Sequence, residues 1–200
     1  MRNPNADQVT EHTIELCLIR HGKTKGNLEK RYIGSTDEEL LAEERERLAG
    51  LSYERPELLF VSGKKRAMET AKILFPEDKP VVIPELNEMD FGEFEGKNYL
   101  ELQDDPVYQQ YIDSNGETPF PKGESRGEFA DRIERGFDIL MQRTREQGKR
   151  RVCVVAHGGT FMAILWRKLR GDYFSYYVGN GECLRVNVTE GKNEETWDIT

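Results

Sequence analysis

Two of the three histidines in this chain stand where catalysis could use them. His21 and His157 each follow a short apolar run and precede a glycine, whereas His12 lies in a polar stretch. A neutral imidazole nitrogen can attack phosphorus if an acceptor holds the proton on the other ring nitrogen. A backbone carbonyl near Gly22 could be that acceptor for His21. The pattern indicates nucleophilic phosphoryl chemistry at His21, with His157 facing the same phosphate.

Arginines accompany these histidines. Arg20 comes directly before His21, and Arg66 follows the second predicted strand, about one turn into a helix. The planar guanidinium binds two phosphoryl oxygens at once and stays charged, so it suits phosphate better than lysine does. Lys64 and Lys65 are typical of a solvated basic helix start, and for Arg66 this interpretation and phosphate binding are equally supported.

The segment from Glu85 to Gly96, ELNEMDFGEFEG, carries a cluster of carboxylates in a predicted turn. One of these groups could be a general acid that protonates a leaving alcohol. Glu93 and Glu95 are better explained as parts of an acidic surface loop. Spacing alone therefore predicts an acid in this segment without identifying it.

Two other phosphate-handling patterns fail. Gly22, Lys23 and Thr24 match the end of a P-loop, but the glycine required five residues earlier is Cys17, and no apolar run ends in a magnesium-binding aspartate. A thiol phosphatase would need an arginine six residues after Cys17, where Lys23 stands. A histidine nucleophile remains the better interpretation.

The overall charge and composition exclude several classes of function. A formal net charge of −8 over 200 residues argues against nucleic-acid binding, which depends on clustered lysine and arginine. The longest apolar runs are far too short to cross a bilayer, and the first residues lack the apolar stretch of a signal peptide. We therefore expect neither a nucleic-acid partner nor a membrane partner.

The cysteines Cys17, Cys153 and Cys183 each lie in an apolar, strand-like run. Their odd number and their spacing fit neither a zinc site nor a disulfide framework. We expect buried, reduced thiols, no metal site, and a cytoplasmic location.

The elements that must position these groups alternate along the chain. Strands are predicted at residues 14–19, 58–62, 81–83 and 151–156, with a hairpin around Gly191 at the end. Helices are predicted after residue 21, before Gly50, at 64–76, up to 147, and at 159–170, and Thr36 with Glu39 and Ser125 with Glu128 have capping-box spacing. Alternation of this kind indicates an open α/β sheet with helices on both faces and a ligand site beyond the carboxyl ends of the strands.

The length fits one domain with one site. We expect a flexible leader at residues 1–13, a single domain at 14–200, and within it a lid-like insertion at about 97–124, which is rich in proline and glycine. Substrate specificity is expected to come from this insertion.

In this order, the motifs resemble the histidine phosphatase superfamily, also called the phosphoglycerate mutase-like family. Its Arg-His-Gly-x-Thr-x-x-Asn signature is matched by Arg20, His21, Gly22, Thr24 and Asn27, and its Arg-x-x-Gly pair by Arg31 and Gly34. The resemblance implies His21 as nucleophile and Glu88 as proton donor. It implies catalytic roles for Arg20, Arg66 and His157, and substrate binding by Thr24, Asn27, Gly34 and Gly158.

The same resemblance implies a three-layer α/β/α sandwich with a mostly parallel sheet and an antiparallel edge. It implies a hydrolase that acts on a small phosphorylated metabolite through a phosphohistidine, without metal or cofactor, and that could form a homodimer. The region from 86 to 125 is most similar to the branch that contains α-ribazole phosphatases and broad-specificity bacterial phosphatases. Lys23, Gly63 and Lys64 depart from the common pattern without removing a catalytic group.

Two alternatives stay open. A phosphoglycerate mutase would return the phosphoryl group to a phosphoglycerate, but it needs basic residues in the insertion, where the chain offers little beyond Lys97 and Lys122. A catalytically silent protein would keep the pocket only to bind a phosphorylated ligand.

Overall fold

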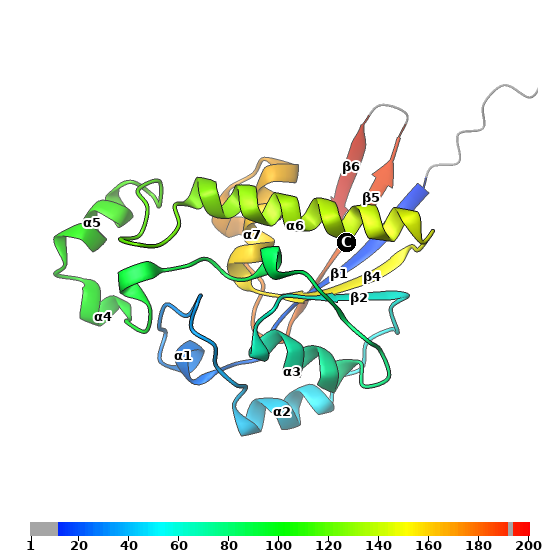
Figure 1. The fold of residues 1–200 in the computed structure, drawn as a ribbon, viewed down its shortest axis with the longest axis horizontal. Helices are drawn as coiled ribbons and strands as arrows, with labels where there is room; N and C mark the ends of the chain where they lie inside the picture. Colours follow the sequence, from blue (N-terminus) through cyan, green and yellow to red (C-terminus); the bar gives the residue numbers. More distant parts are fainter. Residues whose placement is uncertain (1–11, 192–193) are drawn as a thin grey trace, which may run out of the picture.

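The computed structural model describes residues 12–191 and 194–200, and these form a central six-stranded sheet (Figure 1). Across the sheet the order is β3 (Val81–Val82), β2 (Leu58–Val61), β4 (Arg151–Ala156), β1 (His12–Arg20), β5 (Cys183–Glu190) and β6 (Glu195–Ile199). The strands from β3 to β1 pair in parallel, whereas β5 and β6 are antiparallel to their neighbours. The predicted parallel sheet with an antiparallel edge is confirmed.

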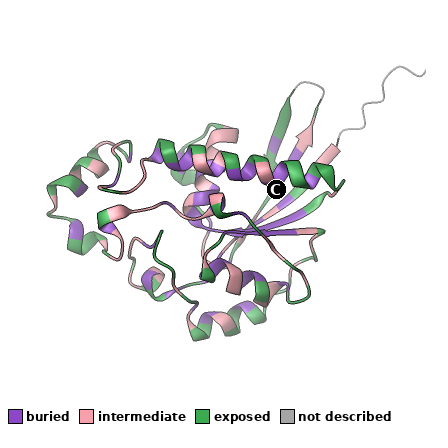
Figure 2. Ribbon diagram, viewed as in Figure 1, coloured by how far each residue is buried: buried purple, intermediate pink, exposed green. Residues whose placement is uncertain are grey.

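Helices cover both faces of this sheet, as Figure 1 shows. On one face lie α2 (Ala42–Ala49) and α3 (Lys65–Leu74), and on the other lie α6 (Arg126–Glu146) and α7 (Gly158–Leu169). Because side chains alternate along a strand, Leu16 and Leu18 join the core beneath α6 and α7, while Ile19 joins the core beneath α3. Figure 2 shows how deeply the central strands are buried. The three-layer α/β/α architecture is confirmed.

The register of the sheet brings the two histidines together. β1 and β4 are parallel neighbours, with Arg20 opposite Ala156. The residues that directly follow these two strands are His21 and His157, so both histidines lie at the same edge of the sheet. This is the carboxyl edge at which open α/β sheets bind ligands.

The helix caps agree with the sequence prediction in one case and differ in another. Ser125 caps α6 and forms the predicted capping box with Glu128. α2 begins only at Ala42, after Leu41, and has no side-chain cap. The Thr36 hydroxyl binds the Glu95 carboxylate instead, at 2.8 Å. The capping box predicted for Thr36 is wrong because a carboxylate 59 residues away competes for the hydroxyl.

The expected insertion at 97–124 contains two helices, α4 (Tyr99–Leu102) and α5 (Pro106–Asp113), which Figure 1 shows at one end of the molecule. Aromatic side chains of the insertion pack on one another and on the preceding segment: the Tyr111 and Phe120 ring centroids are 4.1 Å apart, and Tyr108 contacts Phe94. The remaining short elements are α1 (Lys25–Leu28) and the 3₁₀ turns η1 (Pro84–Leu86), η2 (Gly92–Phe94) and η3 (Tyr173–Tyr176). Lid motion of this insertion stays a prediction.

The first strand begins two residues earlier than predicted. Residues 1–11 of the predicted leader lie outside the described residues. The last two, His12 and Thr13, belong to β1, where they pair with Glu190 and Thr189 of β5. The first strand thus extends beyond its apolar run, because backbone pairing with β5 continues into the polar residues that precede that run.

Among the described helices, none is long and apolar enough to cross a membrane.

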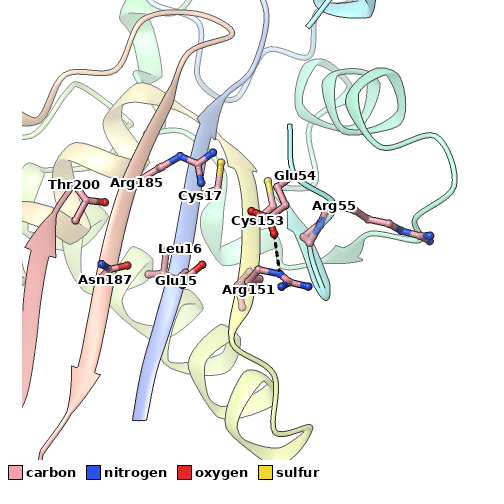
Figure 3. Close-up of a pocket in the computed structure, with 12 residues that line it drawn as sticks. Glu15, Leu16, Cys17, Glu54, Arg55, Arg151, Cys153, Arg185, Asn187 and Thr200 are labelled. Carbon is pink, nitrogen blue, oxygen red and sulfur yellow. Dashed lines mark ion pairs between the residues drawn. The ribbon is translucent and has the colours of Figure 1, made fainter. Parts of the chain in front are cut away.

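The cysteines correct another expectation. Cys17 of β1 and Cys183 of β5 form a disulfide, with their Cα atoms 6.1 Å apart, and Cys153 is free and buried. The prediction of buried, reduced thiols is therefore wrong for Cys17 and Cys183 and agrees with the structure for Cys153. Cys17, Cys153 and Arg185 line a cavity of about 230 Å³. Figure 3 shows these side chains on the central strands. None of the residues predicted for the catalytic site lines this cavity.

Candidate active site

His21 is held in the tautomer that nucleophilic attack requires. The residue is only 3% exposed, and its Nδ1 lies 2.7 Å from the carbonyl oxygen of Gly22. A carbonyl oxygen can only accept, so Nδ1 donates and the lone pair of the neutral ring is on Nε2. The predicted backbone acceptor near Gly22 is therefore present.

The surroundings of His21 also keep it neutral. Burial lowers its pKa well below the ordinary value, and the positive charges of Arg66 and Arg20 lower it further, while the bond to Gly22 acts in the opposite direction. A protonated imidazole has no lone pair to donate. The pKa shift and the tautomer thus both favour a nucleophilic Nε2.

His157 faces His21 across the site. Its ring centroid lies 5.1 Å from that of His21, in an edge-on arrangement, and the side chain is fully buried. The Ser62 hydroxyl lies 2.7 Å from Nε2, while Nδ1 is buried with no hydrogen-bond partner. With Ser62 donating to Nε2, the neutral ring carries its proton on Nδ1, which is then a donor. Ser62 was missed by sequence reasoning as a positioning group.

The two predicted arginines are fixed by backbone carbonyls and an aromatic ring. Arg20 donates from Nη1 to the Tyr177 hydroxyl and the Val178 carbonyl, at 2.9 and 3.0 Å, and its guanidinium lies over the Tyr177 ring. Arg66 is 1% exposed. Burial this deep excludes a solvated helix start for Arg66, and phosphate binding by its guanidinium stays a prediction.

Three backbone carbonyls hold the end of the Arg66 side chain. Nη1 donates to Thr36 at 2.8 Å, and Nη2 donates to Ile33 and Gly34 at 3.2 and 3.1 Å. All three acceptors lie in the loop after α1. The orientation of Arg66 therefore depends on that loop.

Unpartnered donors gather around His21. Among the described residues, four buried side-chain polar atoms lack a hydrogen-bond partner: Arg20 Nε, Arg66 Nε, His157 Nδ1 and Arg167 Nε. Three of the four belong to neighbours of His21: the charges of Arg20 and Arg66 lower its pKa, and the His157 ring lies against its ring. A buried donor without a partner is costly, and native proteins keep few of them. Such donors suit a bound anion.

Glu88 lies in the loop between η1 and η2, and its carboxylate contacts the beginning of α7. Its Oε2 accepts from the Gly159 backbone N–H at 3.1 Å, and its Oε1 accepts from Met89 at 3.0 Å. The absence of a side chain at Gly159 leaves room for the carboxylate, because an added Cβ would displace Glu88 from this position. Glu88 also lines one cavity with Arg20 and Gly158. Within the carboxylate cluster, the geometry thus favours Glu88 as the acid.

Thr24 and Asn27 form the cap of α1. Thr24 accepts from the Asn27 N–H, and the Asn27 side-chain oxygen accepts from the Thr24 N–H at 3.1 Å. Asn180 joins them, because its side-chain amide donates to Asn27 and to the backbone carbonyl of His21. Asn180 was missed by sequence reasoning, since nothing in its local sequence connects it to His21. The Thr24 hydroxyl is used within the cap. The Asn27 Nδ2 donors make no hydrogen bond to the described residues and are available for a ligand.

Gly34 and Gly158, both predicted to bind substrate, have different surroundings. The Gly34 N–H donates to Glu95 and its carbonyl accepts from Arg66, so both of its polar backbone groups have partners within the protein. Gly158 begins α7 and packs against Arg20, whose guanidinium carbon would lie 3.3 Å from an added Cβ. Gly34 therefore positions Arg66 in this structure, Gly158 lies directly beside Arg20, and substrate binding by either glycine stays a prediction.

Glu95 corrects the expectation of a plain surface carboxylate. It accepts hydrogen bonds from the backbone of Gly34, Ser35 and Phe91 and from the Thr36 hydroxyl. Burial raises its pKa, but these hydrogen bonds together outweigh burial, and the net pKa is lowered. Glu95 therefore fixes the loop whose carbonyls hold Arg66. Glu93, in contrast, is exposed, and its ion-pair partner among the described residues is Lys122.

We expect Glu95→Gln to lower the free energy of unfolding by about 2 kcal/mol, because hydrogen bonds to a charged acceptor contribute more than neutral ones. The stabilisation is present above the unfolded pKa and is lost as pH falls through the lowered folded pKa. Urea unfolding at pH 7 and pH 4 measures both effects. The control is Glu93→Gln, which should change stability by less than about 0.5 kcal/mol. Equal effects of the two variants at pH 7 would contradict the assigned role.

Comparison with known proteins identifies the family. A model described as "Histidine phosphatase superfamily (branch 1)" matches residues 16–197. The chain belongs to this superfamily.

Across residues 12–191 and 194–200, no group of three or more His, Cys, Asp or Glu side chains is placed to hold a metal ion.

Several members of the superfamily are similar to most of this chain. The adenosylcobalamin/α-ribazole phosphatase of Escherichia coli K12 is 30% identical over 165 residues, which are 77% of this chain and 78% of that protein. A 2,3-bisphosphoglycerate-dependent phosphoglycerate mutase 2 of Gloeobacter violaceus is 35% identical over 162 residues, 75% of this chain and 73% of that protein. The match to a mannitol-1-phosphatase of Eimeria tenella, 34% identical over 123 residues, covers 52% of this chain and only 40% of that longer protein.

A solved structure agrees with these relatives. The α-ribazole phosphatase of Shigella flexneri superposes with a TM-score of 0.75 at 25% identity, covering 93% of this chain and 95% of that one. The resemblance to the α-ribazole phosphatase branch is thereby confirmed. The chain is an enzyme of this superfamily, with phosphatase or mutase-type activity.

Proposed function

We propose that this enzyme hydrolyses phosphomonoesters of small metabolites through a phosphohistidine at His21, without metal or cofactor. The observation that carries the proposal is the group of unpartnered buried donors, Arg20 Nε, Arg66 Nε and His157 Nδ1, around a neutral His21. A phosphoryl group placed there would meet donors on several sides and a lone pair on Nε2.

In the first step, His21 Nε2 attacks phosphorus in line with the leaving oxygen, and the N–P bond forms as the P–O bond breaks. The electron pair stays on the leaving oxygen, which takes a proton from the Glu88 carboxyl. In the second step, water attacks the phosphohistidine while Glu88 accepts a proton from it. The N–P electron pair returns to Nε2, and inorganic phosphate leaves.

Catalysis in this proposal is mainly electrostatic. Phosphoryl transfer spreads negative charge over the three equatorial oxygens, so fixed donors aimed at these oxygens stabilise the transition state. Arg66 is fixed by three carbonyls and Arg20 by Tyr177 and Val178, so neither guanidinium must reorganise during the reaction. The Ser62 hydroxyl holds the ring of His157 through its hydrogen bond with Nε2.

The second candidate is phosphoryl transfer of the mutase type, because a relative 35% identical carries that name. The two basic residues of the insertion do not support it. Lys122 is exposed and paired with Glu93, and Lys97 lies over the Phe94 ring, and neither lines the cavity beside Arg20. Hydrolysis is therefore the better supported activity.

Product analysis separates these activities. The enzyme is incubated with 3-phosphoglycerate and a trace of 2,3-bisphosphoglycerate, and separately with benzyl phosphate, with ³¹P NMR detection. We expect inorganic phosphate from benzyl phosphate and no build-up of 2-phosphoglycerate. Accumulation of 2-phosphoglycerate would establish the mutase, and phosphate binding without turnover of either compound would establish a catalytically silent binding protein.

The lowered pKa of His21 predicts the acidic limb of the pH profile. The neutral, nucleophilic ring persists to pH values below about 6.5, the ordinary histidine pKa. We expect kcat/KM, corrected for the ionisation of the substrate phosphate, to keep its value from pH 7.5 to 6.5 and to fall only at lower pH. Steady-state rates between pH 4.5 and 8.5 test this. An acidic limb centred at or above pH 6.5 would contradict a nucleophile kept neutral by burial.

A further inference from the structure

An apolar cavity of about 290 Å³ adjoins the phosphate-binding groups. Arg20, Glu88 and Gly158 line it on the side of the proposed chemistry. The remaining lining is largely aromatic and aliphatic, and it includes Tyr111, Ile112, Phe129, Met162, Phe174 and Tyr177. A phosphoryl group at His21 would therefore direct its leaving group toward this cavity, which we call the leaving-group cavity.

Three of its lining residues are unusually exposed for apolar side chains. Ile112, Phe174 and Tyr177 are 46%, 58% and 64% exposed, and they come from α5, η3 and the residue after η3. Separate parts of the chain thus place large apolar groups in water around one opening. Contiguous apolar surface of this kind, beside a few polar groups, is typical of a ligand site.

One positive charge lies within this apolar lining. Arg126, at the beginning of α6, is only 8% exposed, and its guanidinium lies 4.9 Å from the Tyr173 ring centroid and 5.9 Å from that of Phe174. The backbone carbonyl of Asn115 accepts from its Nη2. Its carboxylate partner, Glu117, is 3.6 Å away and has a side chain that is 73% exposed.

These contacts leave Arg126 with capacity to bind another group. A guanidinium has five N–H donors and prefers two-point contact with a carboxylate or phosphate. The exposed Glu117 is well solvated and neutralises it weakly. A second anion in the leaving-group cavity would meet a charge already largely removed from water, where electrostatic interactions are stronger than at the surface.

We propose that the substrate is a phosphomonoester whose leaving alcohol carries an apolar ring and, beyond it, an anionic group that binds Arg126. The ring lies against Phe174 and Ile112, and the anion pairs with the guanidinium. This inference rests on the proposed hydrolysis at His21 and adds the chemical class of the leaving group.

The test compares phosphomonoesters whose leaving alcohols have similar acidity. Ethyl phosphate, benzyl phosphate, 3- and 4-carboxybenzyl phosphate and the two matching carboxamides are hydrolysed in parallel. We expect kcat/KM to be at least about tenfold higher for benzyl than for ethyl phosphate, and about tenfold higher for one carboxylate isomer than for its carboxamide. The net charge of −8 on the protein would by itself disfavour the carboxylate, so this preference requires a local cation.

Variants assign the two preferences to residues. Arg126→Gln should reduce the carboxylate-to-carboxamide ratio to about one, and Arg126→Lys should restore part of it. Arg135→Gln, an exposed arginine on the same helix, is the matched control and should keep the wild-type ratio. Phe174→Ala should reduce the benzyl-to-ethyl ratio, whereas Leu100→Ala, another exposed apolar residue, should not.

Each ratio is measured on one protein preparation, so partial unfolding of a variant cancels. Equal rates for the carboxylates and their carboxamides in the wild type, or a ratio unchanged in Arg126→Gln, would overturn the proposal while benzyl phosphate is still hydrolysed. Absence of hydrolysis for every compound would instead overturn the proposed function.

Discussion

Replacing His21 by alanine is expected to lower kcat for benzyl phosphate by about 10⁴-fold or more, because the nucleophile and the intermediate it forms are both lost. The neighbouring donors would still bind phosphate, so KM should change much less than kcat. Steady-state kinetics measures this split. The matched control is His12→Ala, which changes the first residue of β1, whereas His21 directly follows the last.

The alanine variant should remain folded, because the sheet registers on both sides of β1 end at or before Arg20. Circular dichroism and a thermal melt establish this point. A folded His21→Ala enzyme that keeps more than about a tenth of the wild-type kcat would contradict a nucleophilic His21, whatever the behaviour of the His12 control.

The second large effect is expected for Arg66→Lys, with a loss of about 10² to 10³ in kcat/KM. The guanidinium holds carbonyls of residues 33, 34 and 36 with its two terminal nitrogens while Nε remains unpartnered. A lysine ammonium keeps the charge but has no planar fork with which to divide its donors between a loop and a phosphoryl group. Lys65→Met, on the exposed side of the same helix, is the control.

Phosphate affinity distinguishes this role from simple destabilisation. Arg66→Lys should weaken competitive inhibition by inorganic phosphate or vanadate together with the loss of rate, and Lys65→Met should leave both unchanged. If Arg66→Lys lost stability but kept wild-type inhibition constants, Arg66 would be a structural anchor of the loop and not a phosphate ligand.

The parts of the site that lie at strand ends could be predicted from the sequence. Buried parallel strands read as apolar runs, and their carboxyl ends meet at one edge, so His21 and His157 could be predicted to lie at that edge. That β1 and β4 are neighbours is known only from the structure. The carbonyl acceptor at Gly22 is one residue from the histidine it orients, and local geometry sufficed to predict it.

The parts that depend on long-range contacts could not be predicted. Glu95 binds residues about 60 positions earlier, Ser62 meets His157 across 95 residues, and Asn180 reaches back to His21 across 159. None of these residues has a distinctive local sequence. Thr36 shows the opposite case. Its local sequence has capping-box spacing, but its hydroxyl donates to the distant Glu95 carboxylate and forms no cap.

The cavity beside the site was also outside the reach of sequence patterns. Its apolar wall combines Ile112 from α5 with Phe174 from η3, and its buried charge is Arg126 from the beginning of α6. In the sequence, Arg126 follows the capping Ser125 and has the appearance of an ordinary first-turn residue. Only the packing of aromatic rings over its guanidinium sets it apart.

The phosphohistidine is tested most directly by trapping it. The enzyme is mixed with a ³²P-labelled phosphomonoester, quenched in alkali within milliseconds, and digested for peptide mapping under conditions that preserve phosphohistidine. We predict transient, acid-labile label on the peptide that contains His21, and no label in His21→Ala. Stable turnover without any trapped label, or label on His157 or on a serine instead, would contradict nucleophilic catalysis by His21.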